Sequence, residues 1–154
     1  MARSGITLLE MLIVVGLISL MVGISYPAIS SGLESVRLRT AADSIVSFLN
    51  AALNRAERRQ EVMEVSISKG ESALVLRSAA PDFERRLDLP DGVSVSRVLP
   101  EPAVEDDGPR RFYLYPGGTV PRFGVEIRNR RGSKRTVMVD PITGAPRIEE
   151  DERE

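Results

Sequence analysis

Glu10 is the residue whose chemistry stands out, because it lies in an otherwise apolar stretch. Residues 6–9 and 11–33 contain no charged side chain. A carboxylate at the centre of a bilayer costs about 2.5–3.5 kcal/mol, and less near the end of a helix. We therefore expect Glu10 to acquire a partner wherever this segment finally lies.

The chain lacks the side chains of the commonest catalytic sites. It contains no histidine and no cysteine, which removes the usual general base, thiol nucleophiles, thiolate zinc sites and disulfides. Lys69 and Lys134 lie near glycines in expected turns, where the desolvated amine of a Ser-Lys dyad is not expected. We expect no enzymatic activity, no cofactor and no metal.

Five cationic residues gather in one predicted hairpin, called here the basic hairpin: Arg128, Arg130, Arg131, Lys134 and Arg135. Because the formal net charge of the chain is -1, electrostatic partners must be argued from such local clusters. The cluster suits phosphates, but no aromatic residue is interleaved to stack bases. A solvated tip or a docking surface for another subunit is the favoured interpretation, with DNA as the alternative.

Acidic residues gather in two segments. The proline-rich stretch 99–110 holds Glu101, Glu105, Asp106 and Asp107, and residues 149–154 form an acidic tail. Oxygen ligands suit calcium, but the spacing does not match an EF-hand loop, so we expect a solvated surface loop. The tail is expected to be disordered.

The segment that carries Glu10 has the length of a membrane anchor. The uncharged run from Met11 to Leu33, at about 1.5 Å per residue, reaches roughly 34 Å and can cross a core of about 30 Å. A cleavable secretory signal has a shorter apolar region, of about 7–15 residues. A plain anchor explains the length and leaves Glu10 unexplained.

Two further features shape this predicted transmembrane helix. Gly16, Ser19 and Gly23 recur on one face, roughly opposite Glu10, which predicts contacts with several neighbouring helices. Pro27 lacks an amide hydrogen and predicts a kink near residues 23–27.

The chain after the anchor reads as an amphipathic helix followed by strands. Residues 34–60 predict a core-facing helix, continuous with the anchor. Its apolar stripe is Leu38, Ala41, Ala42, Ile45, Leu49, Ala52, Leu53 and Ala56. Alternation and turn residues predict hairpins over 63–77, 85–98 and 123–139, which we combine into a single antiparallel sheet.

The residues Gly5-Ile6-Thr7-Leu8-Leu9-Glu10-Met11-Leu12 resemble the class III signal of type IV prepilins and type II secretion pseudopilins. The resemblance implies cleavage by a prepilin peptidase between Gly5 and Ile6. It also implies N-methylation of Ile6 and a role for Glu10 in docking the subunit into a helical filament.

The C-terminal half is similar to H-type minor pseudopilins, the GspH/FimT-like family. It shares with them, in order, an aromatic segment, a Pro-x-Gly turn at 116–118, a hairpin and a Thr-Gly turn at 143–144 before a last strand. The resemblance implies an α+β, type IV pilin-like fold, with a long N-terminal helix packed on a C-terminal antiparallel β-sheet.

The implied organisation has four parts. These are a leader (1–5), a transmembrane helix (6–33), a periplasmic pilin-like domain (34–148) and the acidic tail (149–154). The implied function is a minor pseudopilin, anchored once in the inner membrane and assembled with other pseudopilins into a periplasmic pseudopilus. FimT-like relatives serve DNA uptake through basic C-terminal residues, so a DNA-binding minor pilin is the alternative.

Overall fold

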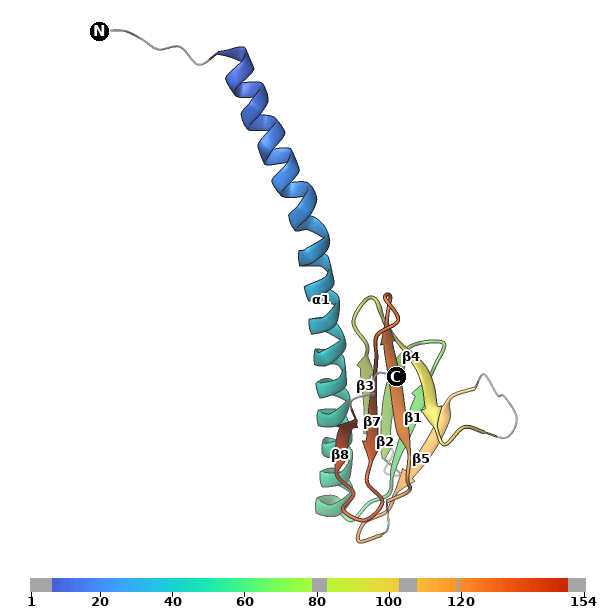
Figure 1. The fold of residues 1–154 in the computed structure, drawn as a ribbon. Helices are drawn as coiled ribbons and strands as arrows, with labels where there is room; N and C mark the ends of the chain where they lie inside the picture. Colours follow the sequence, from blue (N-terminus) through green and yellow to red (C-terminus); the bar gives the residue numbers. More distant parts are fainter. Residues whose placement is uncertain (1–6, 79–82, 103–107, 119, 150–154) are drawn as a thin grey trace. The chain divides into compact units, whose positions relative to one another are not determined.

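A computed structural model of the chain describes residues 7–78, 83–102, 108–118 and 120–149, and the side chains among them except those of 24–31. The chain forms two compact units, residues 1–34 and 35–154. One helix and eight strands follow one another along the described chain (Figure 1). They are α1 (Leu8–Arg59), β1 (Met63–Ser68), β2 (Ala73–Ser78), β3 (Glu84–Asp88), β4 (Val93–Leu99), β5 (Arg110–Leu114), β6 (Gly124–Asn129), β7 (Lys134–Val139) and β8 (Pro146–Glu149).

Local signals set both ends of α1. The Thr7 hydroxyl accepts a hydrogen bond from the Glu10 amide at 3.3 Å, which satisfies one of the free donors of the first turn. At the other end Gln60 takes a positive φ of 53°, and the Glu61 amide bonds back to the Ala56 carbonyl. This is the Schellman arrangement that stops a helix.

The first unit contains the helical residues 8–34. The large apolar side chains from Leu8 to Val22 are exposed, each by 44% or more. Within the described part of the chain, no helix combines the length and the hydropathy that crossing a membrane requires. Gly5 and Ile6 lie outside the described residues, and so does the Pro27 side chain, so the kink stays a prediction although α1 includes residue 27.

In the second unit, α1 buries the stripe that its periodicity predicts. Seven of the eight stripe residues are buried, Leu53 is half-buried, and Phe48 joins them. They share one core with the inward side chains of the strands. Burial of a Leu, Ile or Phe side chain contributes about 1.5–3 kcal/mol, so the large residues of this stripe fix the helix on the sheets.

The strands form two four-stranded sheets, so the prediction of a single sheet was wrong. The strand orders are β3-β2-β1-β5 and β4-β6-β7-β8, and all pairs are antiparallel. The hairpins β1–β2 and β6–β7 are as predicted. The expected hairpin over 85–98 does not form, because β3 pairs with β2 and β4 pairs with β6.

The physical reason lies in pairing between distant segments. The turn at 90–92 looks like a hairpin turn, with Gly92 at φ 86°, but it carries the chain from one sheet to the other. The chain then returns to the first sheet for β5, which the sequence analysis missed, and crosses again to β6. Three crossings therefore interleave the two sheets along the sequence.

An aromatic stack joins the sheets. The Phe112 ring on β5 lies 4.3 Å from the Phe123 ring, which directly precedes β6, with 12° between the planes. Phe123 is fully buried. Because stacked rings in a core add to the energy of burial, this contact fixes β5 of one sheet against β6 of the other.

Candidate functional site

Glu10 is the third residue of α1 and lies among exposed apolar side chains. Its amide bonds the Thr7 hydroxyl, and its residue as a whole is exposed. Leu8, Leu9, Met11 and Leu12 around it are exposed by 55–84%. The positive end of the helix dipole also stabilises a carboxylate in the first turn. This end of α1 therefore presents one carboxylate in an apolar setting.

The basic hairpin is built on the turn between β6 and β7. The buried Asn129 side chain accepts hydrogen bonds from the amides of Arg131 at 3.0 Å and Ser133 at 2.9 Å. Gly132 supplies the positive φ of 84° that the turn requires. The turn that presents the cations is thus held by its own first residue.

One cation of the basic hairpin is paired within the sheet. Lys134 Nζ lies 3.3 Å from Glu126 Oε1, and the Ser96 hydroxyl donates to the same oxygen at 2.7 Å. Burial alone would raise the pKa of Glu126, but these two hydrogen bonds and the charge of Lys134 outweigh it, so the pKa is lowered. Glu126 is therefore a buried carboxylate that offsets part of the hairpin's charge.

The basic residues do not lie on one face. Arg128 and Lys134 are cross-strand partners and share a face, whereas Arg135 pairs with the buried Ile127 and points to the other. Arg130 folds over the turn at Gly92, where a Cβ would lie 3.3 Å from its Nε. A hollow of about 500 Å³ opens there, lined by Gly92, Val93, Ser94, Arg128, Asn129, Arg130 and Gly132.

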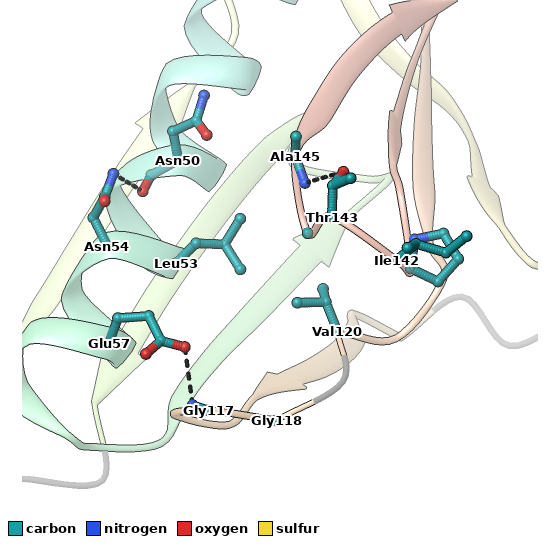
Figure 2. A pocket seen from close by; sticks show the side chains of 12 residues that line it. Asn50, Leu53, Asn54, Glu57, Gly117, Gly118, Val120, Ile142, Thr143 and Ala145 are labelled. Atoms are coloured by element: carbon teal, nitrogen blue, oxygen red, sulfur yellow. Dashed lines mark hydrogen bonds between the residues drawn. The ribbon is translucent and has the colours of Figure 1, made fainter.

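A second hollow, of about 470 Å³, lies between α1 and two loops of the same unit (Figure 2). The Gly117 amide donates to Glu57 Oε1 at 2.9 Å and ties one loop to the helix. Leu53 and Val120 point toward one another across the opening. Its lining is Asn50, Leu53, Asn54 and Glu57 of α1 with Gly117, Gly118, Val120, Pro141, Ile142, Thr143, Gly144 and Ala145.

The turns at 116–118 and 143–144 were predicted, but their meeting with α1 at this second hollow was not. Asp140 accepts hydrogen bonds from the Ile142 and Thr143 amides at 2.7 and 3.2 Å, which lowers its pKa. An Asp-Pro-x-Thr segment is typical of such a turn, so this signal was available. No local sequence signal predicts the contact between Glu57 and Gly117, which are 60 residues apart.

The described residues offer little to a metal ion. No group of three His, Cys, Asp or Glu side chains comes together among them. Of the acidic loop, Glu101 pairs with Arg97 at 2.9 Å, while Glu105, Asp106 and Asp107 lie outside the described residues. The acidic tail 149–154 was predicted to be disordered. Glu149 belongs to β8, and 150–154 lie outside the described residues.

Solved structures of two pilin-like proteins share this arrangement of a helix packed on antiparallel sheets. The minor pseudopilin EpsH from the type 2 secretion system of Vibrio cholerae superposes with a TM-score of 0.58 at 16% identity, covering 76% of this chain and 99% of EpsH. The type IV minor pilin FimU of Pseudomonas aeruginosa PAO1 gives 0.52 at 17% identity, covering 77% and 90%. No protein-family profile and no curated protein sequence matches the chain.

The two likenesses establish the fold of the chain as type IV pilin-like. The predicted α+β class is thereby confirmed, with two sheets in place of one. Both solved neighbours are named as pilin or pseudopilin subunits.

Proposed function

We propose that this chain is a minor pseudopilin, a structural subunit of the periplasmic pseudopilus of a type II secretion system. The observation that carries the proposal is the exposed apolar helix from Leu8 to Val22 with one carboxylate, Glu10, near its start. Such a surface is stable in water only when other apolar groups cover it. The second unit has a pilin-like fold, which supports the view that this cover consists of the equivalent helices of neighbouring subunits.

In this proposal the chain passes through two states. Before assembly, residues 6–33 anchor it in the inner membrane with the second unit in the periplasm. Prepilin peptidase cuts between Gly5 and Ile6, and Ile6 becomes the N-methylated terminus. In the filament Glu10 then bonds the new terminal amine, of its own or an adjacent subunit, so that its charge is compensated where water is excluded. The function is assembly and not catalysis.

Replacing Glu10 tests the docking role. The Glu10→Gln variant should enter filaments about tenfold less or worse, because a hydrogen bond to a charged group contributes roughly 1.5–3 kcal/mol. The measurement is the amount of chain in sheared filaments, relative to the amount in the membrane. Asp43→Asn removes a carboxylate from an exposed position of the same helix and should assemble normally. Equal incorporation of the Glu10→Gln variant contradicts the docking role.

Processing is tested separately by mass spectrometry of the N-terminus from native membranes. The expected mature chain begins at N-methylated Ile6. A chain that retains residues 1–5 in assembled filaments would return the anchor to an ordinary membrane helix.

A second candidate function is DNA binding by a minor pilin, favoured by the exposed Arg128, Arg130 and Arg131 at one end of the second sheet. Against it, Lys134 is paired with Glu126 and Arg135 lies on the other face. If DNA is bound, the affinity of the full chain must fall steeply with added salt, and Arg128→Gln should reduce that slope by about one unit. Affinity that is absent at low salt removes this candidate.

A further inference from the structure

Exposed cations gather at one end of the second unit, the end at which α1 enters it, and we call this surface the entry face. Gly117 and Gly144 lie beside Glu57 and Leu53, near the last turns of α1. The turn between β6 and β7 lies at the opposite end of the unit, toward residue 35, together with the turn at 90–92 (Figure 1). The entry face is formed by the exposed Arg37, Arg39, Arg128 and Arg130.

These four guanidinium groups have no partner in the described part of the chain. Neither an ion pair nor a side-chain hydrogen bond joins any of them to another described residue. Other cations of the unit do pair, as Arg86 does with Glu71 and Asp88 at 2.9 and 2.7 Å. The exposed Asp91 adjoins the turn at 90–92, but no ion pair joins it to the four arginines. The entry face is therefore open to an external anion.

Two of the arginines flank a hollow that suits one oxyanion. Arg128 is the cross-strand partner of Ser94, and the Arg130 side chain lies over Gly92, where a Cβ would be 3.3 Å from its Nε. All four residues line the hollow of about 500 Å³ described above. A guanidinium group can donate two parallel hydrogen bonds to phosphate oxygens, and a hydroxyl can donate one more.

In the proposed anchored state the other two arginines lie at the level of the lipid headgroups, so this inference rests on the proposed function. Arg37 and Arg39 come four and six residues after Leu33, where the uncharged run ends. At about 1.5 Å per residue, they lie roughly 6 and 9 Å beyond the apolar segment. The polar layer of a bilayer extends roughly 5–7 Å beyond its hydrocarbon core.

We propose that the entry face binds anionic phospholipid headgroups before assembly, with one lipid phosphate held between Arg128 and Arg130. Each basic group beside an anionic membrane strengthens such a contact roughly fivefold. A lipid surface is favoured over a nucleic acid because the anchor itself brings headgroups to Arg37 and Arg39. The contact holds the second unit against the membrane, and the subunit must release it on entering the filament.

Fluorescence quenching by spin-labelled headgroups tests the contact. The chain has no native cysteine, so Ser133→Cys in the turn of the basic hairpin carries a single fluorophore. The full chain is reconstituted into vesicles of phosphatidylcholine, alone or mixed with phosphatidylglycerol, that contain a trace of headgroup-labelled lipid. We expect strong quenching only with phosphatidylglycerol at low salt, and its loss in roughly 1 M salt, where the Debye length is about 3 Å. Equal quenching in both kinds of vesicle overturns the proposal.

Paired charge variants of the labelled chain separate the entry face from the general charge of the unit. Arg128→Gln with Arg130→Gln should lower the equilibrium constant for contact roughly fivefold for each arginine. Arg58→Gln with Arg59→Gln removes the same charge from exposed positions in the last turn of α1 and should leave the quenching unchanged. Quenching that is as strong in the first variant as in the native chain overturns the proposal.

Anchoring is measured in the same vesicles by resistance to carbonate extraction. A chain that is extracted contradicts the proposed anchor and, with it, this inference. A chain that resists extraction while its label stays unquenched overturns the inference alone. Binding of duplex DNA that requires Arg128 and Arg130, in such an unquenched chain, assigns the surface to nucleic acid and also overturns it.

Discussion

At the scale of single residues, Glu126 bears on the stability of the second unit. It is a buried carboxylate that accepts hydrogen bonds from Ser96 and Lys134. Removing one partner from such a group leaves the other buried without compensation, which costs more than the pair contributes. The group therefore couples the stability of the sheet to pH.

The pH dependence follows from the lowered pKa. Because the folded chain holds Glu126 ionised below the ordinary value of 4.5, the unfolded chain binds the proton more readily. The stabilisation is therefore present above about pH 4.5 and is lost as the pH falls through the folded pKa.

Glu126→Gln should thus lower the free energy of unfolding by about 1–2 kcal/mol at pH 7, and the difference from the native chain should shrink at acid pH. Urea unfolding from pH 7 down to pH 3 measures it. Ser96→Ala removes one partner and should reduce the pH dependence in the same direction. Parallel curves for the native and Glu126→Gln chains would contradict this assignment.

At the scale of elements, the helix and its loops meet at Gly144. This glycine has a φ of 70°, and a Cβ there would lie 3.1 Å from Val120 Cγ2 and 4.0 Å from Leu53 Cδ2. Both the backbone conformation and the space favour glycine. The position therefore limits how closely the loop before β8 approaches α1.

Gly144→Ala should lower the free energy of unfolding by more than the roughly 1–2 kcal/mol that a left-handed conformation costs an alanine. Thermal or urea unfolding measures the change. Two glycines serve as controls, because no atom lies within 4 Å of a Cβ built at either. Gly132→Ala, at φ 84°, should show only the cost of the left-handed backbone conformation. Gly70→Ala should show neither this backbone cost nor the cost of a steric clash. Equal losses at 144 and 132 would exclude the steric part.

Elements specified by local signals were predictable from the sequence. The stripe from Leu38 to Ala56 repeats with the helical period, and the turns at 69–71 and 131–133 contain the glycines that close hairpins. The pairs β1–β5 and β4–β6 join segments tens of residues apart, and no local sequence signal in either segment indicates which strand it pairs with. This is why a single sheet was predicted.

The candidate sites follow the same rule. The cations of the basic hairpin were predictable as a set, and simple alternation already requires Lys134 and Arg135 to face opposite sides. The pairing of Lys134 with Glu126 depends on the β6–β7 register, which the predicted hairpin did not specify. The contact of Glu57 with Gly117 depends on the tertiary fold alone.

At the scale of the whole molecule, the two compact units divide the chain at residues 34 and 35. Among the residues whose side chains the structure describes, every buried apolar core residue lies at Leu38 or beyond. The second unit therefore holds the described core within itself, and we expect it to fold without the apolar residues of the first.

A fragment that begins at Ser35 should fold cooperatively and remain soluble, with a single unfolding transition. Circular dichroism during urea unfolding checks this, with Leu49→Asp as a control that buries a charge in the core and should abolish the transition. A fragment that is unfolded although the full chain in detergent is folded would contradict the independence of the second unit.

The three crossings between the sheets have a consequence for the order in which the chain folds. The hairpins β1–β2 and β6–β7 close short loops and can form early, at little entropic cost. The pairs β1–β5 and β4–β6 close long loops, and each sheet has a strand, β5 or β4, that lies between strands of the other in the sequence. The first sheet has all its strands once the chain has reached β5, whereas β4 pairs only with β6, so a nascent chain must extend past β6 before β4 meets its partner.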